Sequence, residues 1–337
     1  MGETKQGIAI AGNLIVDQIK YVDRYPSPQT LAAISRMELS IGGLACNCGL
    51  TLAKLDPRLP LTVIGVLGED EMARHVLERF ARHANIDCSR IRRAGHTSYT
   101  DVMTTPDGGR TFFTYSGSNA LLTPDDFDFT NLDARLLHVG YILLLEGLDQ
   151  GDPDYPTAMC RVLDGARQAG IATSVDVISE DSDRYRKLVV PALPYTDYLS
   201  INEIEAERTT GVPLRDAKGE LIAANLRAAC ERLLELGVGR WAVIHSQYLS
   251  GGMDAEGNYV EEASWPIPPG FKKSSVGAGD AFTSGLLYAI WRGWDLARAI
   301  HVAGAVAAWS LSGAGGADAI LPLDELLARM RAFREQA

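Results

Sequence analysis

Long apolar runs are missing from the sequence. Although 46% of the 337 residues are hydrophobic, no uninterrupted run reaches the ~18 residues that a membrane-spanning helix needs. We expect the N-terminus to form a strand rather than a secretory signal, because Glu3 and Lys5 precede an apolar stretch that Gly12 and Asn13 interrupt. Gln6 stands where a myristoylation motif requires Ser or Thr. We therefore expect a cytoplasmic protein without a membrane partner.

Cysteine and clustered histidine are also scarce. The five cysteines form no CxxC pair, and an odd number is unsuited to a disulfide framework. Cys46 and Cys48 are poorly spaced for a shared metal, so we interpret the thiols as structural. The six histidines include no pair four residues apart, and they therefore predict no local metal-ligand cluster.

Positive charge is in deficit. Lys and Arg number 32 against 43 Asp and Glu, which gives a formal net charge of −11 at pH 7. Such a surface repels phosphodiester backbones, and no basic run offsets it, so we expect no nucleic-acid partner. A small anionic ligand stays compatible with this charge, because one local positive site can outweigh a diffuse field. The motifs of Walker-type NTPases, Rossmann dinucleotide-binding proteins and α/β-hydrolases are absent as well.

What the sequence does contain is an alternation of apolar runs typical of strands with amphipathic runs typical of helices. The expected strands are 8–11, 62–66, 136–139, 171–177, 198–201 and 241–245, and the expected helices are 72–83, 155–169, 182–192 and 223–236. This order predicts an α/β fold with a mostly parallel sheet and helices on both faces. The length permits two domains, but no linker-like segment divides the chain.

Two segments interrupt the alternation. Residues 15–40 have little helical periodicity, and residues 99–115 resemble two alternating strands around the turn sequence 106–109. Together they are compatible with a small accessory sheet outside the main domain. Surface loops with a single hairpin fit the pattern equally well.

The segment Ser274–Phe282, which reads SSVGAGDAF, is the strongest candidate for a functional site. It precedes an apolar helix expected from about Ala281 to Trp291. Its small residues let backbone N–H groups converge, and the helix dipole favours an anion at this end. Asp280 adds a carboxylate within one turn, so the segment suits deprotonation of a hydroxyl that attacks a phosphoryl group. A loop followed by a helix-initiating Asp is the alternative interpretation.

The tetrapeptide 277–280, GAGD, resembles the C-terminal signature of the ribokinase-like (PfkB-type) carbohydrate kinases. Other matches follow in that family's order: Gly12 with Asp17, Gly42-Gly43 with Asn47, Gly65 with Gly68 and Asp70, Asn202 with Glu205, and Gly316-Ala317 before Pro322. Each motif is weak alone, but the ordered series over residues 8–322 is specific. The resemblance implies one three-layer domain over residues 1–337, with a small β lid formed by about 15–40 and 99–117.

Phosphoryl transfer is the first role that the resemblance implies. Asp280 corresponds to the family's general base, and the backbone of Gly277, Ala278 and Gly279 corresponds to an anion hole. Many relatives are activated by a monovalent cation that an Asp three residues before this turn helps to hold. Ser274 occupies that place here, so we expect only a weak dependence on such a cation.

The nucleotide side carries two further matches. Asn202 and Glu205 correspond to the family's NxxE motif, which organises Mg²⁺ through its waters near the phosphates of ATP. Gly316 and Ala317 correspond to its nucleotide-side tail, whereas residues 245–252 depart from a usual glycine-rich stretch. Taken without the resemblance, Asn202 and Glu205 are more typical of a helix N-cap with a capping box.

The acceptor side is implied to comprise Asp17, Gly42, Gly43 and Asn47. A carboxylate such as Asp17 can accept hydrogen bonds from two sugar hydroxyls, and the glycines allow a sugar to approach the backbone. Without the resemblance, Gly42-Gly43 is more typical of a tight turn and Asp17 of a solvated strand end. Ribokinases carry Asn where this chain has Ile15, which argues against ribose itself.

These matches predict an ATP-dependent, Mg²⁺-dependent kinase of a monosaccharide. A nucleoside kinase of the same fold is an alternative, with Tyr99, Phe112 and Phe113 as candidates for a slot that holds the base. A catalytically silent sugar- or nucleotide-binding regulator is a second alternative, although an intact Asp280 argues against it. The family's lid often pairs subunits, which makes a homodimer through the lid a further expectation.

Overall fold

The main sheet contains nine strands, in the order β13-β12-β11-β10-β9-β8-β1-β4-β5. The computed structural model describes residues 5–336. Within this sheet, the seven neighbouring strands β11, β10, β9, β8, β1, β4 and β5 pair in parallel. Strand β12 pairs antiparallel with both β11 and β13. Their bounds are β1 Gly7–Gly12, β4 Leu61–Leu67, β5 Ile86–Arg93, β8 Ala134–Ile142, β9 Ala172–Val177, β10 Tyr198–Asn202, β11 Trp241–His245, β12 Leu249–Asp254 and β13 Tyr259–Ala263. The prediction of a mostly parallel central sheet is confirmed.

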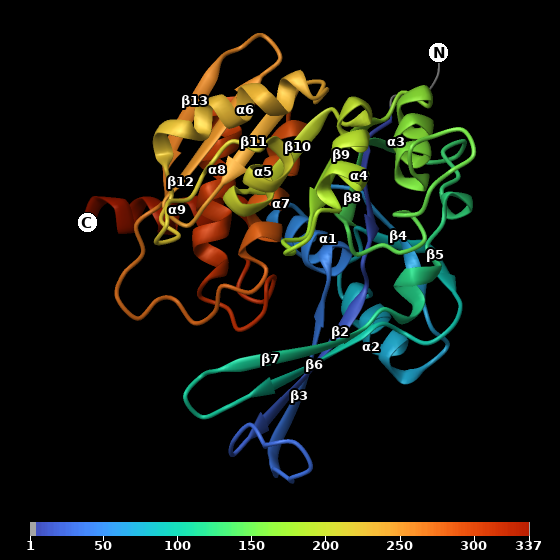
Figure 1. The fold of residues 1–337 in the computed structure, drawn as a ribbon, viewed down its shortest axis with the longest axis vertical. Helices are drawn as coiled ribbons and strands as arrows, with labels where there is room; N and C mark the ends of the chain where they lie inside the picture. Colours follow the sequence, from blue (N-terminus) through green and yellow to red (C-terminus); the bar gives the residue numbers. More distant parts are fainter. Residues whose placement is uncertain (1–4, 337) are drawn as a thin grey trace.

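Helices cover both faces of this sheet (Figure 1). Alternate residues of β1 enter different hydrophobic cores. Ala9 and Ala11 belong to the core that includes residues of 158–168 and 226–235, whereas Ile8 and Ile10 belong to the core that includes residues of 44–55, 71–80 and 278–330. The helices are α1 Leu44–Leu55, α2 Glu71–Phe80, α3 Ala158–Gln168, α4 Tyr185–Leu188, α5 Glu203–Thr210, α6 Leu226–Glu235, α7 Ala278–Trp291, α8 Leu296–Ser310 and α9 Leu323–Gln336. Within residues 5–336, none of them is long and apolar enough to cross a membrane.

Two sequence expectations differ from the structure in this region. The helix expected over 182–192 is wrong, because only Tyr185–Leu188 is α-helical and Val190–Tyr195 forms a 3₁₀ helix. Pro191 and Pro194 explain the break, since proline lacks an N–H and disfavours helical geometry in the residue before it. Helix α7 starts at Ala278, earlier than expected, which brings Asp280 into its first turn.

A second, four-stranded sheet has the order β3-β2-β6-β7 and extends away from the main sheet (Figure 1). It is built from β2 Ile15–Val22, β3 Ile34–Gly42, β6 Tyr99–Thr104 and β7 Arg110–Tyr115. The expected accessory sheet is therefore confirmed. Its register sets Asp17 opposite Ser40 on β3 and Thr100 on β6, so these three residues share one face of the sheet.

Candidate active site

The turn before α7 requires glycine and leaves backbone donors unpaired. Gly277 has φ +73°, and a Cβ there would lie 2.5 Å from the Cα of Gly316. The N–H of Ala278 donates to the carbonyl of Ser275 at 3.2 Å. The N–H groups of Gly277, Gly279 and Asp280 have no acceptor in the described part of the chain. The unpaired donors of the turn are therefore Gly277, Gly279 and Asp280, and Ala278, expected in the anion hole, is already engaged.

Asp280 lies beside these donors, and its carboxylate is buried. Its Oδ2 accepts a hydrogen bond from Nδ2 of Asn47 at 2.7 Å, and its Oδ1 accepts one from the hydroxyl of Tyr141 at 2.7 Å. Burial raises the pKa of Asp280 above its usual range, and the hydrogen bonds from Tyr141 and Asn47 offset part of that rise. The arrangement fixes a carboxylate next to unpaired amides, as general-base chemistry on a phosphoryl acceptor requires.

A cavity of about 180 Å³ opens onto Asp280, and two further buried carboxylates line it. Asp176 is the penultimate residue of β9, and Glu205 lies in the first turn of α5. Burial raises the pKa of Asp176 well above its usual range, and the charges of Glu205 and Asp280 add to that shift. Sequence reasoning missed Asp176, although a carboxylate at the C-terminal end of a parallel strand is a recognised signal.

Asn202 and Glu205 form a capping box at the start of α5. The side-chain oxygen of Asn202 accepts from the N–H groups of Ile204 and Glu205, and Oε2 of Glu205 accepts from the N–H of Asn202 at 2.9 Å. The other oxygen of Glu205 accepts from Oγ of Ser179 and Nδ2 of Asn202, both at 2.7 Å. Burial raises the pKa of Glu205 to about 7. Both residues also line the cavity, so the capping role is compatible with the predicted role toward Mg²⁺.

The carboxylates suit a magnesium ion that keeps its waters. Among residues 5–336, no three His, Cys, Asp or Glu side chains are placed to hold a metal ion directly. Asp176, Glu205 and Asp280 nevertheless gather around one small cavity. Mg²⁺ prefers oxygen ligands, dehydrates reluctantly and usually keeps several waters. This donor set therefore fits Mg²⁺ held through water.

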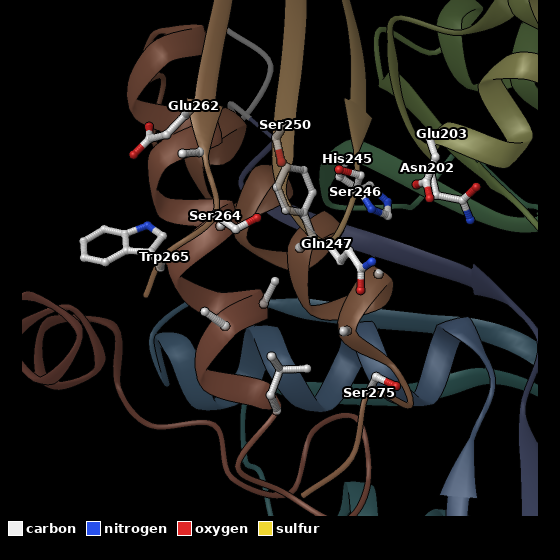
Figure 2. Close-up of a pocket in the computed structure, with 18 of the residues that line it drawn as sticks. Asn202, Glu203, His245, Ser246, Gln247, Ser250, Glu262, Ser264, Trp265 and Ser275 are labelled. Carbon is white, nitrogen blue, oxygen red and sulfur yellow. The ribbon is translucent and has the colours of Figure 1, made fainter. Parts of the chain in front are cut away.

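A larger cavity, of about 460 Å³, continues from the turn along α8. The two cavities share Asn202, His245, Ser275, Ala278 and Gly279. Figure 2 shows His245, Ser246 and Gln247 at the end of β11, and Ser275 on the loop before α7. A pocket that joins a polar turn to a more apolar floor suits a nucleotide with its phosphates at the turn.

His245 lies at the junction of the two cavities. Its ring lies 4.8 Å from the ring of Phe282, between centroids, and a Cβ on Gly279 would lie 3.5 Å from it. Burial lowers the pKa of His245 to about 4, so the imidazole is neutral at pH 7. The only indication of His245 in the sequence was its place in residues 245–252, which depart from the glycine-rich stretch usual in the family.

Gly316 and Ala317 do not line either cavity. Gly316 packs behind the turn, where a Cβ would lie 3.0 Å from the Cα of Gly277. Ala317 is buried, and its carbonyl accepts a hydrogen bond from Nζ of Lys54 at 2.7 Å. Gly316 thus supports the turn, and a nucleotide contact at Gly316 or Ala317 stays a prediction.

The expected acceptor residues converge at the start of α1. A Cβ on Gly42 would lie 2.5 Å from Oδ2 of Asp17, and Gly43 has φ +80° at the N-cap of α1. Asn47 follows in the first turns of α1 and reaches Asp280. Burial raises the pKa of Asp17 to about 6. Asp17 therefore lies beside Gly42, just before α1, and Asp280 is bonded to Asn47 in the first turn of the same helix.

Asn13 and Tyr141 also lie near the start of α1, on the side expected to bind the acceptor. Neither residue was predicted. Oδ1 of Asn13 accepts from the N–H of Tyr141 at 2.8 Å, and Nδ2 of Asn13 donates to the carbonyl of Leu144 at 3.2 Å. The carbonyl of Asn13 also accepts from the N–H of Ala45. Asn13 thereby ties the end of β1 to both β8 and α1.

Of the three aromatic residues considered for a base slot, the register places only Phe112 on the face of Asp17. Phe112 lies opposite Val102, which lies opposite Ile19, two residues from Asp17 on β2. Tyr99 pairs with Val16, and Phe113 pairs with Asp101. Because neighbouring side chains alternate between faces, Tyr99 and Phe113 lie on the opposite face.

Known proteins resemble this chain along nearly its whole length. An ATP-dependent ribose-1-phosphate kinase of Halopiger xanaduensis is 27% identical over 305 residues, which cover 88% of this chain and 89% of the relative. A nucleoside kinase of Methanothermobacter thermautotrophicus is 26% identical over 324 residues, which cover 94% and 92%. The structure of Arabidopsis thaliana ribokinase complexed with ribose and ATP is 20% identical and superposes with a TM-score of 0.77, covering 97% of this chain and 99% of that one.

The structural match establishes a shared ribokinase fold. The family is established by sequence, because residues 5–322 match the profile of the pfkB family of carbohydrate kinases. That match covers the main sheet, the small sheet and the turn at Asp280. The chain therefore belongs to the pfkB family of carbohydrate kinases.

Proposed function

We propose that this protein is a kinase that transfers the γ-phosphoryl group of ATP to a hydroxyl of a monosaccharide. The observation that carries the proposal is the geometry at the start of α7. A buried carboxylate, Asp280, is held by two donors within one turn of three unpaired backbone N–H groups. A general base and an anion site at that separation are what an in-line phosphoryl transfer needs.

ATP would occupy the 460 Å³ cavity with its phosphates at the turn. The N–H groups of Gly277, Gly279 and Asp280, together with the positive end of the α7 dipole, would stabilise charge on the transferring phosphoryl group. Bound Mg²⁺ would offset phosphate charge, with its waters held by Asn202 and Glu205. Asp280 would take the proton of the acceptor hydroxyl as that oxygen attacks.

The monosaccharide would bind between the start of α1 and the small sheet. Asp17 would accept two of its hydroxyl hydrogen bonds, with Gly42, Gly43 and Asn47 around it. The base of the small sheet approaches the transfer site, because a Cβ on Gly315 would lie 3.4 Å from Oγ of Ser40, on Asp17's face. We propose that segments 15–40 and 99–117 act as a lid of one domain and exclude water on closure.

The opposite face of the lid supports a homodimer. Met37, Leu39, Phe113 and Tyr115 lie on that face by register, and each is at least 44% exposed. A row of large apolar side chains on one face of a thin sheet favours burial against a second copy. We therefore extend the proposal to a homodimer formed through the lid.

A nucleoside kinase is the second candidate, favoured by one observation. Ile19, Val102 and Phe112 form an apolar strip on the face that carries Asp17. Such a strip suits a base as well as it suits the carbon face of a sugar. The strip is short, and Tyr99 and Phe113 are turned away from it, so we place the monosaccharide first.

The test is ADP release with a panel of monosaccharides, a panel of nucleosides, and no acceptor. We expect turnover with at least one monosaccharide at a rate well above the rate without acceptor. A preference for nucleosides would select the second candidate. Tight binding of sugar or ATP without turnover would instead identify a regulator.

A further inference from the structure

His245 has ring nitrogens that no group of the protein engages. It lies in residues 245–252, which depart from the family's usual pattern, so the resemblance implies no role for it. Nδ1 of His138 lies 3.0 Å from Oγ of Ser174, whereas neither ring nitrogen of His245 has a hydrogen-bond partner among residues 5–336. Nε2 of His138 is enclosed in the core, but the nitrogens of His245 are not. Because His245 lines both cavities, its open nitrogens face space that a ligand would fill.

The fold holds this imidazole against the turn before α7. His245 is the last residue of β11 (Figure 2). It shares a face of the strand with Val243, which packs in the same core as Phe282 of α7. The rings of His245 and Phe282 have centroids 4.8 Å apart. A Cβ on Gly279 would lie 3.5 Å from Cε1 and 3.9 Å from Nε2 of His245, so the Nε2 edge of the ring faces the turn.

The place of the ring between the two cavities indicates which phosphate it would meet. The nucleotide would lie in the 460 Å³ cavity, and the transferring γ-phosphoryl group would lie in the 180 Å³ cavity that opens onto Asp280. The β-phosphate connects these two parts of ATP. It would therefore cross the junction at which His245 lies.

The small cavity offers few other side-chain donors to a phosphate. Its lining residues include the carboxylates of Asp176, Glu205 and Asp280, but no Lys or Arg. Phosphate oxygens there would depend on neutral donors and on the Mg²⁺ that accompanies ATP. A neutral imidazole carries one N–H, and a hydrogen bond to a charged acceptor is roughly twice as strong as one between neutral groups.

We propose that Nε2 of His245 donates a hydrogen bond to the β-phosphate of the bound nucleotide. The inference rests on the proposed function, since it assigns a residue to the proposed ATP site. The competing account is that His245 only packs against Phe282. The two accounts differ in how a substitution affects ADP relative to AMP, which lacks the β-phosphate.

The test measures the dissociation constants of ADP and AMP by calorimetry, in EDTA so that no metal contributes. His245→Leu removes the donor, and a hydrogen bond to a charged group corresponds to a loss of roughly ten- to a hundredfold in affinity. We expect that loss for ADP and little change for AMP.

Two amide variants test which ring nitrogen is the donor. His245→Gln places an amide N–H near the position of Nε2, so it should keep most of the wild-type preference for ADP over AMP. His245→Asn places its amide near the position of Nδ1, so it should lose that preference. If His245→Leu does not fold, the comparison of these two variants decides the question.

His301→Gln is the matched control. The ring of His301 also packs against an aromatic side chain, with its centroid 4.7 Å from that of Trp265, but His301 lines neither cavity. The ratio of its AMP and ADP dissociation constants should equal that of wild type. Melting temperatures of all variants show whether a substitution disturbs packing.

Three results would overturn the inference. His245→Leu loses affinity for ADP and AMP equally, as packing alone predicts, or it keeps the ADP affinity of wild type. The third is an ADP preference that His245→Asn keeps and His245→Gln loses. If wild type binds neither nucleotide, the proposed ATP site is wrong and the inference is wrong with it. When wild type phosphorylates a sugar and His245→Leu keeps its ADP affinity, only the inference about His245 is wrong.

Discussion

The transfer site and the small sheet differ in how completely they are built. Asp280 and Asn47 are buried and bonded to each other across helices α7 and α1. By contrast, all six residues of β7 are exposed, as are the first six of β3. The group that would remove a proton is in place before an acceptor arrives, whereas the surface that would select the acceptor is still open.

The two key carboxylates show the same contrast. Asp280 accepts hydrogen bonds from two side chains, and Asp17 accepts none from the described residues. Burial alone raises the pKa of Asp17 to about 6. Asp17 is thus a carboxylate whose partners must come from a ligand, and Asp280 is one whose partners come from the protein.

The comparison predicts that loss of Asp280 stops chemistry and spares binding. Asp280→Asn keeps the shape and the contacts to Tyr141 and Asn47 in part, but removes the base. General-base catalysis contributes about 10²–10⁴-fold, so kcat should fall at least that far, while calorimetry should still detect ATP and acceptor. Near-normal turnover would contradict the assignment of Asp280.

Asp17 should give the opposite pattern, with the main effect on acceptor KM. Asp17→Asn removes a charged acceptor of hydroxyl hydrogen bonds, which raises KM roughly ten- to a hundredfold. Because the ionised form is the binding form and its pKa is about 6, wild-type KM should rise as pH falls below that value. The variant should lack this pH dependence. An unchanged acceptor KM together with a raised ATP KM would place Asp17 in the other site.

A smaller effect is expected at Glu205, where capping and metal roles overlap. Glu205→Gln turns a carboxylate that would hold magnesium-bound waters into a neutral amide. We expect a several-fold higher Mg²⁺ concentration for half-maximal rate, with little change in acceptor KM. A lowered melting temperature with an unaltered Mg²⁺ titration would show that Glu205 serves only the capping box.

More of the fold than of the site could be predicted from the sequence. The strand–helix alternation predicted the parallel sheet, and the turn 106–109 predicted the β6–β7 hairpin. The prediction of a helix over 182–192 was wrong because it followed the apolar pattern and did not take Pro191 and Pro194 into account. Strand β12 was missed because Gly251 and Gly252 weaken its strand signal, and β5 and β13 were not predicted either.

The turn and its Asp were visible because three small residues and a carboxylate occupy four consecutive positions, 277–280. Asp176 and Tyr141 were not, because each is a single polar residue near the C-terminal end of an apolar strand, one position before the last residue. Their approach to Asp280 depends on the order of β8, β9 and β10 in the sheet, which local patterns do not encode. The pairing of Phe112, but not Phe113, with Asp17's face likewise depends on register.

The smallest expected effect concerns monovalent cations. Ser274 accepts a hydrogen bond from the N–H of Val276 at 3.1 Å, a local turn that Asp can also form. Ser274→Asp should therefore keep the turn and add a negative charge, creating or strengthening activation by K⁺. Wild type should respond weakly when about 100 mM KCl replaces NaCl at equal ionic strength. Wild-type activation of about tenfold or more, specific to K⁺, would contradict this expectation.

The most direct test of the central claim is to identify the product. Wild type would be incubated with ATP, Mg²⁺ and the best acceptor of the panel, and phosphorus NMR would follow the phosphate groups, with Asp280→Asn run in parallel. The account predicts a monosaccharide phosphomonoester formed in step with ADP by wild type alone. Inorganic phosphate as the only product, a nucleoside monophosphate formed in preference, or equal product from Asp280→Asn would contradict it.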